Sequence, residues 1–188
     1  MRLVVGITGA SGVIYGIRLL QSLSRVKDVE THLVISEAAE ENILYETDWT
    51  IDKIKSLANY TYDVADIGAA PSSGSFKRDG MIVIPCSIKT MAALSISYNE
   101  NLIVRAGDVT LKERKPLVLV VRETPFHSGH LESMLKLSRM GAIIMPPIPA
   151  FYHKPKKIDD LINHSVGRVL EVFNIEHNLY ERWTGLPH

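Results

Sequence analysis

The chain has 188 residues, and its 21 basic and 21 acidic side chains give a formal net charge of zero. This balance provides no overall field to attract nucleic acid or an anionic membrane, and no apolar run approaches the roughly 18 residues that a membrane span needs. The single cysteine, Cys86, excludes an intramolecular disulfide and suits a reducing compartment. We therefore expect one cytoplasmic domain that covers residues 1–188.

The first half of the chain alternates between two kinds of pattern. Short apolar runs predict strands that are buried on both faces, and apolar side chains at helical spacing predict helices. In chain order we expect a strand at 3–7, a helix at 13–23, a strand at 30–35, a helix at 37–45 capped by Ser36, a short helix at 51–58 and a loop at 66–74. This β-α-β-α beginning implies right-handed crossovers and a parallel sheet.

The second half continues the alternation. We expect strands at 81–84, where Pro85 ends the strand, at 117–121 and at 142–145, helices at 90–97, 102–113, 131–139 and 158–173, and a tail that contains Trp183. The fold class is therefore α/β, a single-domain, doubly wound, Rossmann-like parallel sheet of five expected strands. Such sheets bind ligands outside the carboxyl ends of their strands.

A glycine-rich loop, residues 8–12, follows the first strand and opens a helix. Glycines allow the backbone to approach a phosphate closely, and the free N–H groups and dipole of a helix N-terminus favour an anion. The spacing fits neither the dinucleotide fingerprint nor the P-loop. The loop therefore predicts either a phosphate site or only a tight turn.

Polar side chains follow two later strands. Ser87 and Thr90 stand where a helix starts, so they either cap that helix or receive a phosphate there. Arg122 and Glu123 follow the strand at 117–121, where they either contact a ligand or form a solvated pair. Cys86 is interpreted as a small buried side chain rather than a nucleophile, because no base lies near it in the sequence.

Residues 146–149 form a proline-rich run that presents Phe151 and Tyr152. Such a run suits the wall of a flat or apolar ligand site, and it suits an oligomer contact equally well. His127 and His130 lie close together, but no cysteine, histidine or carboxylate joins them at ligand spacing, so we expect no metal site.

Taken together, these segments resemble the UbiX-type flavin prenyltransferases, a family formerly regarded as phenylacrylic or aromatic-acid decarboxylase subunits. The matching segments are 8–12, 84–87, 105–113, 121–125, 130–135 and 149–153, in order along nearly the whole chain. The resemblance implies a metal-independent enzyme that joins a dimethylallyl group from dimethylallyl phosphate to N5 and C6 of reduced FMN. It also implies a partner decarboxylase of the UbiD type, which receives the prenylated FMN, and a homo-oligomer of high order, such as a dodecamer.

The resemblance assigns roles to residues by position. The flavin-binding segments correspond to Gly9, Ala10, Ser11, Ser36, Ser87, Ile88, Lys89, Thr90 and Arg122. The donor site corresponds to Lys112, Tyr152, Arg168 and Trp183, and the catalytic groups to Ser11, Glu46 and Glu123. A structural salt bridge is the alternative for Arg168, and an ordinary surface charge is the alternative for each carboxylate. Ile67 departs from the pattern, because some relatives have an aromatic side chain there.

Two other functions remain open. An FMN-dependent decarboxylase of the cysteine-oxidising type shares this fold, but it needs a histidine base on the helix after the glycine-rich loop, and residues 13–23 contain none. A flavin-binding subunit without catalysis is the third hypothesis, and turnover by the isolated chain distinguishes it from the other two.

Overall fold

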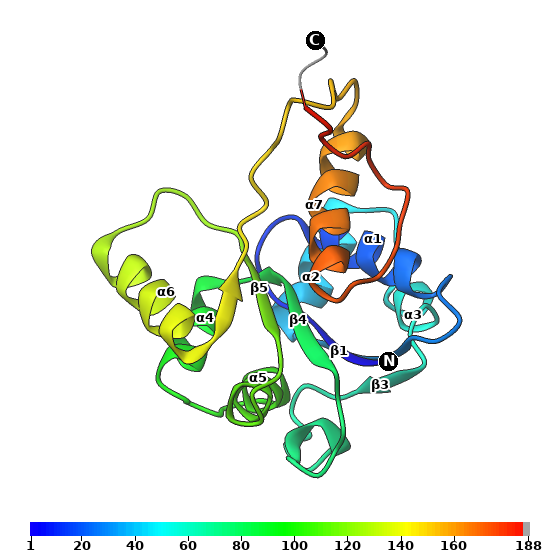
Figure 1. The fold of residues 1–188 in the computed structure, drawn as a ribbon. Helices are drawn as coiled ribbons and strands as arrows, with labels where there is room; N and C mark the ends of the chain where they lie inside the picture. Colours follow the sequence, from blue (N-terminus) through cyan, green and yellow to red (C-terminus); the bar gives the residue numbers. More distant parts are fainter. Residues whose placement is uncertain (186–188) are drawn as a thin grey trace.

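The computed structural model describes residues 1–185, and its strands form one six-stranded parallel sheet with helices on both faces (Figure 1). The strands are β1 (Arg2–Ile7), β2 (Glu30–Ile35), β3 (Tyr60–Tyr62), β4 (Gly80–Cys86), β5 (Leu117–Val121) and β6 (Ala142–Ile144). The helices are α1 (Val13–Leu23), α2 (Glu37–Glu46), α3 (Ile51–Lys55), α4 (Ile88–Ser95), α5 (Leu102–Lys112), α6 (Ser128–Met140) and α7 (Ile158–Val172), with a short 3₁₀ helix at Ala70–Ser72.

The strands lie in the order β3-β2-β1-β4-β5-β6, and all neighbours are parallel. This is the strand order of the Rossmann fold, and it confirms the predicted fold class. The chain first adds β2 and β3 on one side of β1, and it then adds β4, β5 and β6 on the other side. The helices that follow β1 and β4 therefore leave toward opposite faces, which opens a crevice at the carboxyl ends of these two strands.

Two apolar layers separate the sheet from its helices. Leu3, Val5 and Ile7 of β1 face a layer built with α1, α2, α3 and α7, and Val4 faces the layer built with α4, α5 and α6. Figure 1 shows these two groups of helices on opposite sides of the strands. Successive strand residues point to opposite faces, so a continuous apolar run is what a sheet covered on both sides requires.

The structure differs from the sequence prediction in two strands. The sequence does not predict β3, because its three residues, Tyr60 to Tyr62, are polar or aromatic and lie largely at the surface. It becomes a strand only by pairing with β2. Pro85 does not end its strand: β4 continues to Cys86, and its register with β5 shifts between Val83 and Cys86, which accommodates a residue without an N–H.

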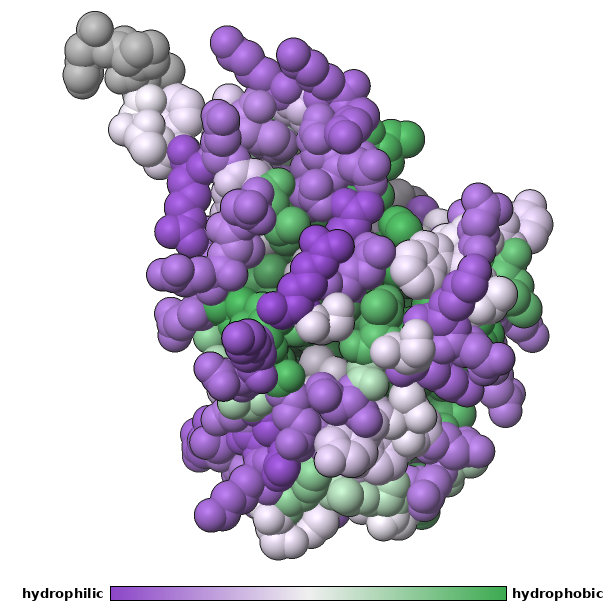
Figure 2. Space-filling model, turned by 90° about the vertical axis from the view of Figure 1, so that its right-hand side faces the viewer, coloured by the Kyte–Doolittle hydropathy of each residue, from purple (hydrophilic) through white to green (hydrophobic). Residues whose placement is uncertain are grey.

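The outer surface on the side of α1 and α3 carries mostly hydrophilic side chains, with apolar patches between them (Figure 2). Among residues 1–185, none of the helices combines the length and apolar character that crossing a membrane requires.

Candidate functional site

Thr8 joins the ends of β1 and β4 at the crevice. Its backbone N–H and its hydroxyl both donate to the carbonyl oxygen of Pro85, at 3.2 and 2.8 Å, and its hydroxyl oxygen accepts the N–H of Ser87 at 2.8 Å. Thr8 is only 2% exposed, so these hydrogen bonds satisfy buried polar groups. The glycine-rich loop and the start of α4 are thereby held side by side.

A cavity of about 680 Å³ opens at this edge of the sheet. Its volume is in the range of small-molecule and cofactor sites. All nine residues that the sequence assigned to the flavin line it, together with Glu123: Gly9, Ala10, Ser11, Ser36, Ser87, Ile88, Lys89, Thr90 and Arg122. The structure therefore brings together loops that are separated by about 25 to 50 residues along the chain.

Helix N-termini give this cavity its electrostatic character. Ser11, which precedes the N-cap of α1, lines it together with Ser36, Ser87 and Asn101, the N-caps of α2, α4 and α5. Unpaired N–H groups and the positive end of each helix dipole favour an anion. Ser36 and Ser87 act as caps through their hydroxyl oxygens, which accept from Ala39 N and Thr90 N. The capping role and the phosphate-binding role are thus compatible at one position.

Gly9 is required by close packing at the floor of this loop. A Cβ atom on Gly9 would lie 2.5 Å from the Cβ of Ala38 in α2, which is closer than real Cβ contacts. Gly12 has a φ of 96°, a left-handed conformation that favours glycine. The loop therefore follows a path that side chains would block, and its backbone stays accessible to a ligand.

The charged side chains at the cavity differ in whether they already have an ion-pair partner. Lys89 pairs with Glu100 at 3.2 Å, whereas the side chain of Arg122 has no hydrogen-bond or ion-pair partner within residues 1–185. Tyr15 of α1 lies nearby: burial raises the pKa of its phenol, and a hydrogen bond with Ser165 and the charge of Arg122 act in the opposite direction. Arg122 is therefore a positive group available to a ligand.

Glu46, at the last position of α2, contacts the backbone beneath the loop. Its carboxylate accepts the N–H of Gly12 at 2.8 Å and that of Val13 at 3.4 Å. An acidic group at this position stabilises the start of α1, because it satisfies free N–H groups and complements the helix dipole. Glu46 is thus close to Ser11 in the fold, although it does not line the cavity itself.

Three of the four residues that the sequence assigned to the donor gather around α7. Tyr152 stacks edge-on with Trp183, with ring centroids 5.8 Å apart, and its hydroxyl lies 3.0 Å from Nε2 of His164. Arg168 and His164 line a smaller cavity of about 220 Å³ beside the proline-rich run. Arg168 also forms an ion pair with Glu171, so the salt bridge that the sequence left open exists. Val120 of β5 lines this smaller cavity, and Arg122, two positions later, lines the larger one, so both cavities lie near the carboxyl end of β5.

Lys112 does not join this group within one chain. It ends α5, which runs back to the amino ends of the strands, and it pairs there with Glu113. The structure therefore separates Lys112 from Tyr152 and Arg168 by the length of the sheet.

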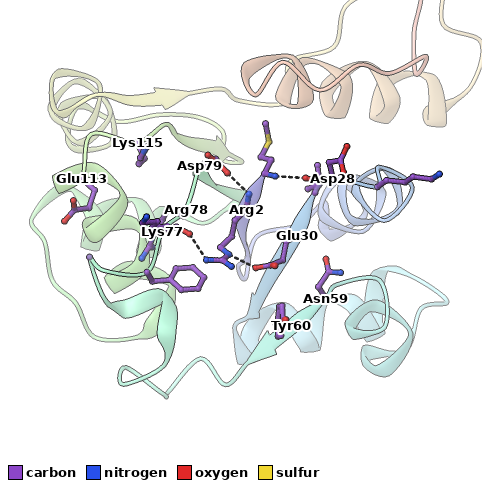
Figure 3. Close-up of a pocket in the computed structure, with 15 residues that line it drawn as sticks. Arg2, Asp28, Glu30, Asn59, Tyr60, Lys77, Arg78, Asp79, Glu113 and Lys115 are labelled. Carbon is purple, nitrogen blue, oxygen red and sulfur yellow. Dashed lines mark hydrogen bonds and ion pairs between the residues drawn. The ribbon is translucent and has the colours of Figure 1, made fainter.

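A larger cavity, of about 990 Å³, lies at that opposite edge (Figure 3). Arg2 in this cavity already has partners: its side chain pairs with Glu30, and its backbone N–H donates to Asp79 at 2.6 Å. Helices end rather than begin at the amino edge, so their dipoles disfavour an anion there. Size alone therefore does not identify the ligand site.

Sequence reasoning missed several residues of the candidate cavity: Thr8, Glu37, Ala38, Val64, Ala65, Glu100 and Asn101. Thr8 stands inside a recognised motif, and Glu37 closely follows a predicted strand, so both positions carried a signal. Val64 and Ala65 follow β3, and the failure to predict that strand removed the signal for them.

Cys86 agrees with its sequence interpretation as a buried side chain. Cys86 is fully buried, and burial raises the pKa of its thiol, which disfavours the nucleophilic thiolate. Within residues 1–185 no three histidine, cysteine, aspartate or glutamate side chains gather as a metal site would require.

Comparison with known proteins first defines the class. Residues 1–170 match the model of the Flavoprotein family, so the chain belongs to that family. The chain is also 54% identical over 185 residues to the flavin prenyltransferase UbiX of Thauera aromatica, covering 98% of this chain and 95% of that protein. The identity to the UbiX protein of Escherichia coli K12 is 54% over 186 residues, covering 98% of each. The chain belongs to the UbiX-type flavin prenyltransferases, which confirms the resemblance seen in the sequence.

Solved structures agree with this assignment. A dodecameric FMN-dependent UbiX-like decarboxylase from Escherichia coli O157:H7 superposes with a TM-score of 0.97 at 50% identity, covering 98% of this chain and 100% of that one. AnUbiX, solved in complex with FMN and dimethylallyl pyrophosphate, superposes with a TM-score of 0.96 at 50% identity, covering 99% and 98%. An FMN-dependent cysteine decarboxylase has a TM-score of 0.61 at 16% identity over 76% of this chain, a likeness that shows the fold alone.

Proposed function

We propose that this chain transfers a dimethylallyl group from dimethylallyl phosphate to reduced FMN, forming bonds at N5 and C6. The observation that carries this proposal is a pair of cavities near the carboxyl end of β5. One is lined by all nine flavin-assigned residues, and the other by Arg168 with Tyr152 next to it. The relatives at 54% identity support the reaction, and the solved relative that contains FMN and a dimethylallyl donor supports both ligands.

The larger cavity fits FMN by charge and by shape. Its four helix N-termini and the free guanidinium of Arg122 suit the phosphate of FMN, and the close packing of Gly9 on Ala38 leaves the loop backbone open to it. Reduced FMN supplies the nucleophilic N5 and C6 atoms. The protein residues have to hold that ring and exclude water beside it.

Arg168 and Tyr152 are the proposed grip on the donor. Ionisation of an allylic phosphate needs stabilisation of a departing anion, and a planar guanidinium can form two parallel hydrogen bonds to it. A hydrogen bond with Tyr180 and the charge of Glu171 raise the pKa of Arg168, so it stays positive at any physiological pH. The rings of Tyr152 and Trp183 offer π faces to a developing allylic cation. These groups neutralise the leaving group without a metal ion.

Ser11, Glu46 and Glu123 are the proposed proton-transfer groups. Ser11 and Glu123 line the larger cavity, whereas Glu46 acts from beneath the glycine-rich loop through its contact with Gly12. A carboxylate whose position is set by backbone N–H groups can move a proton with little reorganisation.

A homo-oligomer is part of the proposal. Large apolar side chains are exposed on α6 and along the proline-rich run, with Leu131 54% and Leu135 52% exposed, and Ile148 72% and Phe151 69% exposed. Exposed apolar surface of this kind is typical of subunit contacts, and a relative of 50% identity is a dodecamer. A second copy could also bring its Lys112 to the donor, which one chain alone cannot do. We further propose a cytoplasmic location and a UbiD-type decarboxylase as the recipient of prenylated FMN.

Decarboxylation is the second candidate, because one solved relative carries that name. The geometry supports decarboxylation less well, because α1 contains no histidine that could act as the base. The α1 side chain whose pKa the charge of Arg122 lowers is the phenol of Tyr15. Product analysis separates the two reactions, and bound flavin without any turnover would indicate a non-catalytic subunit.

The reaction itself can be tested by the mass of the flavin. The purified chain, incubated anaerobically with FMN, dithionite and dimethylallyl phosphate, should yield extracted flavin that is heavier by one isoprene unit. A chelator should leave the yield unchanged, because basic side chains neutralise the leaving group. Recovery of unmodified FMN from an enzyme that binds both ligands would refute the proposal.

Mutations in the two cavities should affect the binding of FMN and of the donor independently. Arg122→Gln should weaken FMN binding at least about tenfold, the effect of losing a charge-assisted hydrogen bond, and leave the affinity for the donor near normal. Arg168→Met should do the reverse. Fluorescence titration with FMN and calorimetry with the donor measure both, with Arg25→Gln, exposed just after α1, as the control. Loss of FMN from Arg168→Met with normal donor affinity would contradict the assignment.

The proton-transfer groups should affect rate rather than binding. Ser11→Ala and Glu46→Gln should fold and bind FMN, while turnover falls by about 10²–10⁴-fold, the usual contribution of general acid–base groups. Glu46→Gln keeps an oxygen that can accept from Gly12, so the start of α1 should persist in circular dichroism. Turnover equal to wild type in both variants would make these residues structural.

The oligomer should depend on α6. Light scattering at micromolar concentration should give a mass well above that of one chain, and the double change Leu131→Glu with Leu135→Glu should lower it, since two charges then oppose burial of the helix. Lys136→Glu, exposed on the same helix, is the matched control. A monomeric mass for the wild-type chain would contradict this part of the proposal.

A further inference from the structure

His164 is a buried residue of α7 for which neither the sequence nor the proposed function has a role. It is 8% exposed and stands one helical turn before Arg168, so both side chains lie on the same face of the helix and line the same cavity. Its Nε2 atom lies 3.0 Å from the hydroxyl oxygen of Tyr152. Tyr152 comes from the segment before α7, so this contact ties that segment to the helix that carries Arg168.

We propose that His164 is a positioning residue for the donor: its Nε2–H donates to the phenolic oxygen of Tyr152, which turns the phenol's own hydrogen toward the phosphate of dimethylallyl phosphate. This inference rests on the proposed function, because it assigns a task to a residue of the donor site. It adds a third residue, which does not touch the donor, to the pair that grips it.

The direction of the hydrogen bond decides whether Tyr152 can bind a phosphate. If the phenol donated to His164, its single hydrogen would be used, and the phosphate, which only accepts, would find no donor there. If the imidazole donates, the phenol keeps its hydrogen for the ligand. A bound phosphate therefore selects the arrangement His164 to Tyr152 to phosphate, a short chain in which each donor strengthens the next.

Packing sets the orientation of the imidazole. The ring of His153 stacks on that of His164 with centroids 5.1 Å apart and planes 6° apart, and the ring of Tyr180 lies 4.6 Å away. Both nitrogens of His153 are buried without a hydrogen-bond partner in the described part of the chain, so His153 contributes contact rather than hydrogen bonds. His164 is thus held between rings, with its Nε2 edge toward Tyr152.

Charge around the imidazole keeps it neutral in the absence of a ligand. Burial lowers the pKa of His164, and the neighbouring His153 and Arg168 lower it further, against the opposing effect of Glu171. A neutral imidazole has one N–H, and that hydrogen can reside on Nε2. Arg168, which lowers the pKa of His164, is also the group that makes the cavity attractive to a phosphate.

The test compares side chains that replace one nitrogen at a time. The amide nitrogen of glutamine can reach the place of Nε2, whereas that of asparagine reaches only the place of Nδ1. In the full-length protein loaded with oxidised FMN, which cannot react, calorimetry measures the dissociation constant of dimethylallyl phosphate. We expect His164→Gln to bind within about twofold of wild type, and His164→Asn and His164→Leu to bind about three- to tenfold more weakly, the effect of one hydrogen bond.

A double-mutant cycle shows whether His164 acts through Tyr152. Tyr152→Phe should weaken donor binding by a similar factor, and adding His164→Leu to Tyr152→Phe should weaken it no further. Arg25→Gln, an exposed change just after α1 and away from the donor site, is the control and should bind the donor like wild type. The affinity for FMN, measured in every variant, reports whether each chain is folded.

The outcomes separate the inference from the function on which it rests. Wild-type protein that binds FMN but not dimethylallyl phosphate would overturn the proposed donor site, and the role of His164 with it. A wild-type donor affinity with equal losses in the glutamine and asparagine variants would overturn the positioning role alone, as would additive losses in the cycle. Should His164→Leu fail to fold, the comparison of glutamine with asparagine decides the question.

Discussion

The hydrogen bonds of Thr8 hold together the two strand ends on which the rest of the site depends. β1 and β4 are neighbours in the sheet, but the helices that follow them leave toward opposite faces, so the backbone diverges at this point. Thr8 spans the divergence by donating to Pro85 and accepting from Ser87. The glycine-rich loop and the start of α4 consequently face one cavity, and the N–H groups of several helices converge there.

Electrostatics, rather than volume, distinguishes the two edges of the sheet. The amino edge has the larger cavity, but Arg2 is paired with Glu30 there, and helices end there. The carboxyl edge has the smaller cavity, the helix N-termini and the unpaired guanidinium of Arg122, whose side chain finds no partner within residues 1–185. Because all strands of a parallel α/β fold run in one direction, the connecting helices run in the opposite direction and begin at the carboxyl edge of the sheet. The positive ends of their dipoles therefore favour an anionic ligand at that edge only.

The region around α7 is organised by one carboxylate. Glu171 pairs with Arg168, accepts from the hydroxyl of Tyr180 at 2.8 Å and accepts from Arg182 at 3.2 Å. Burial would raise the pKa of Glu171, but these donors outweigh it and lower the pKa, so the carboxylate stays charged. Glu171 thereby holds the guanidinium of Arg168 and also ties the C-terminal segment onto α7. The salt bridge of Arg168 and a grip on phosphate are compatible, because a guanidinium has five N–H donors.

Local patterns in the sequence predict most of the fold and single out several residues that line the candidate cavity. Apolar runs and helical spacing identify β1, β2, β4, β5 and β6, and strand-end position identifies residues such as Ser87 and Arg122, because parallel strands all end at one edge. β3 escapes prediction, since three largely exposed residues carry no pattern of their own and become a strand only through pairing with β2. Contacts between distant side chains are decided by the tertiary structure alone: Glu46 meets Gly12 across 34 positions of sequence, and the length of α5 carries Lys112 to the edge opposite Arg168. Spacing along the chain specifies a residue's secondary structure and the end of the strand at which it stands. Which side chains meet depends on helix length, strand order and the packing between layers, and these are properties of the whole fold.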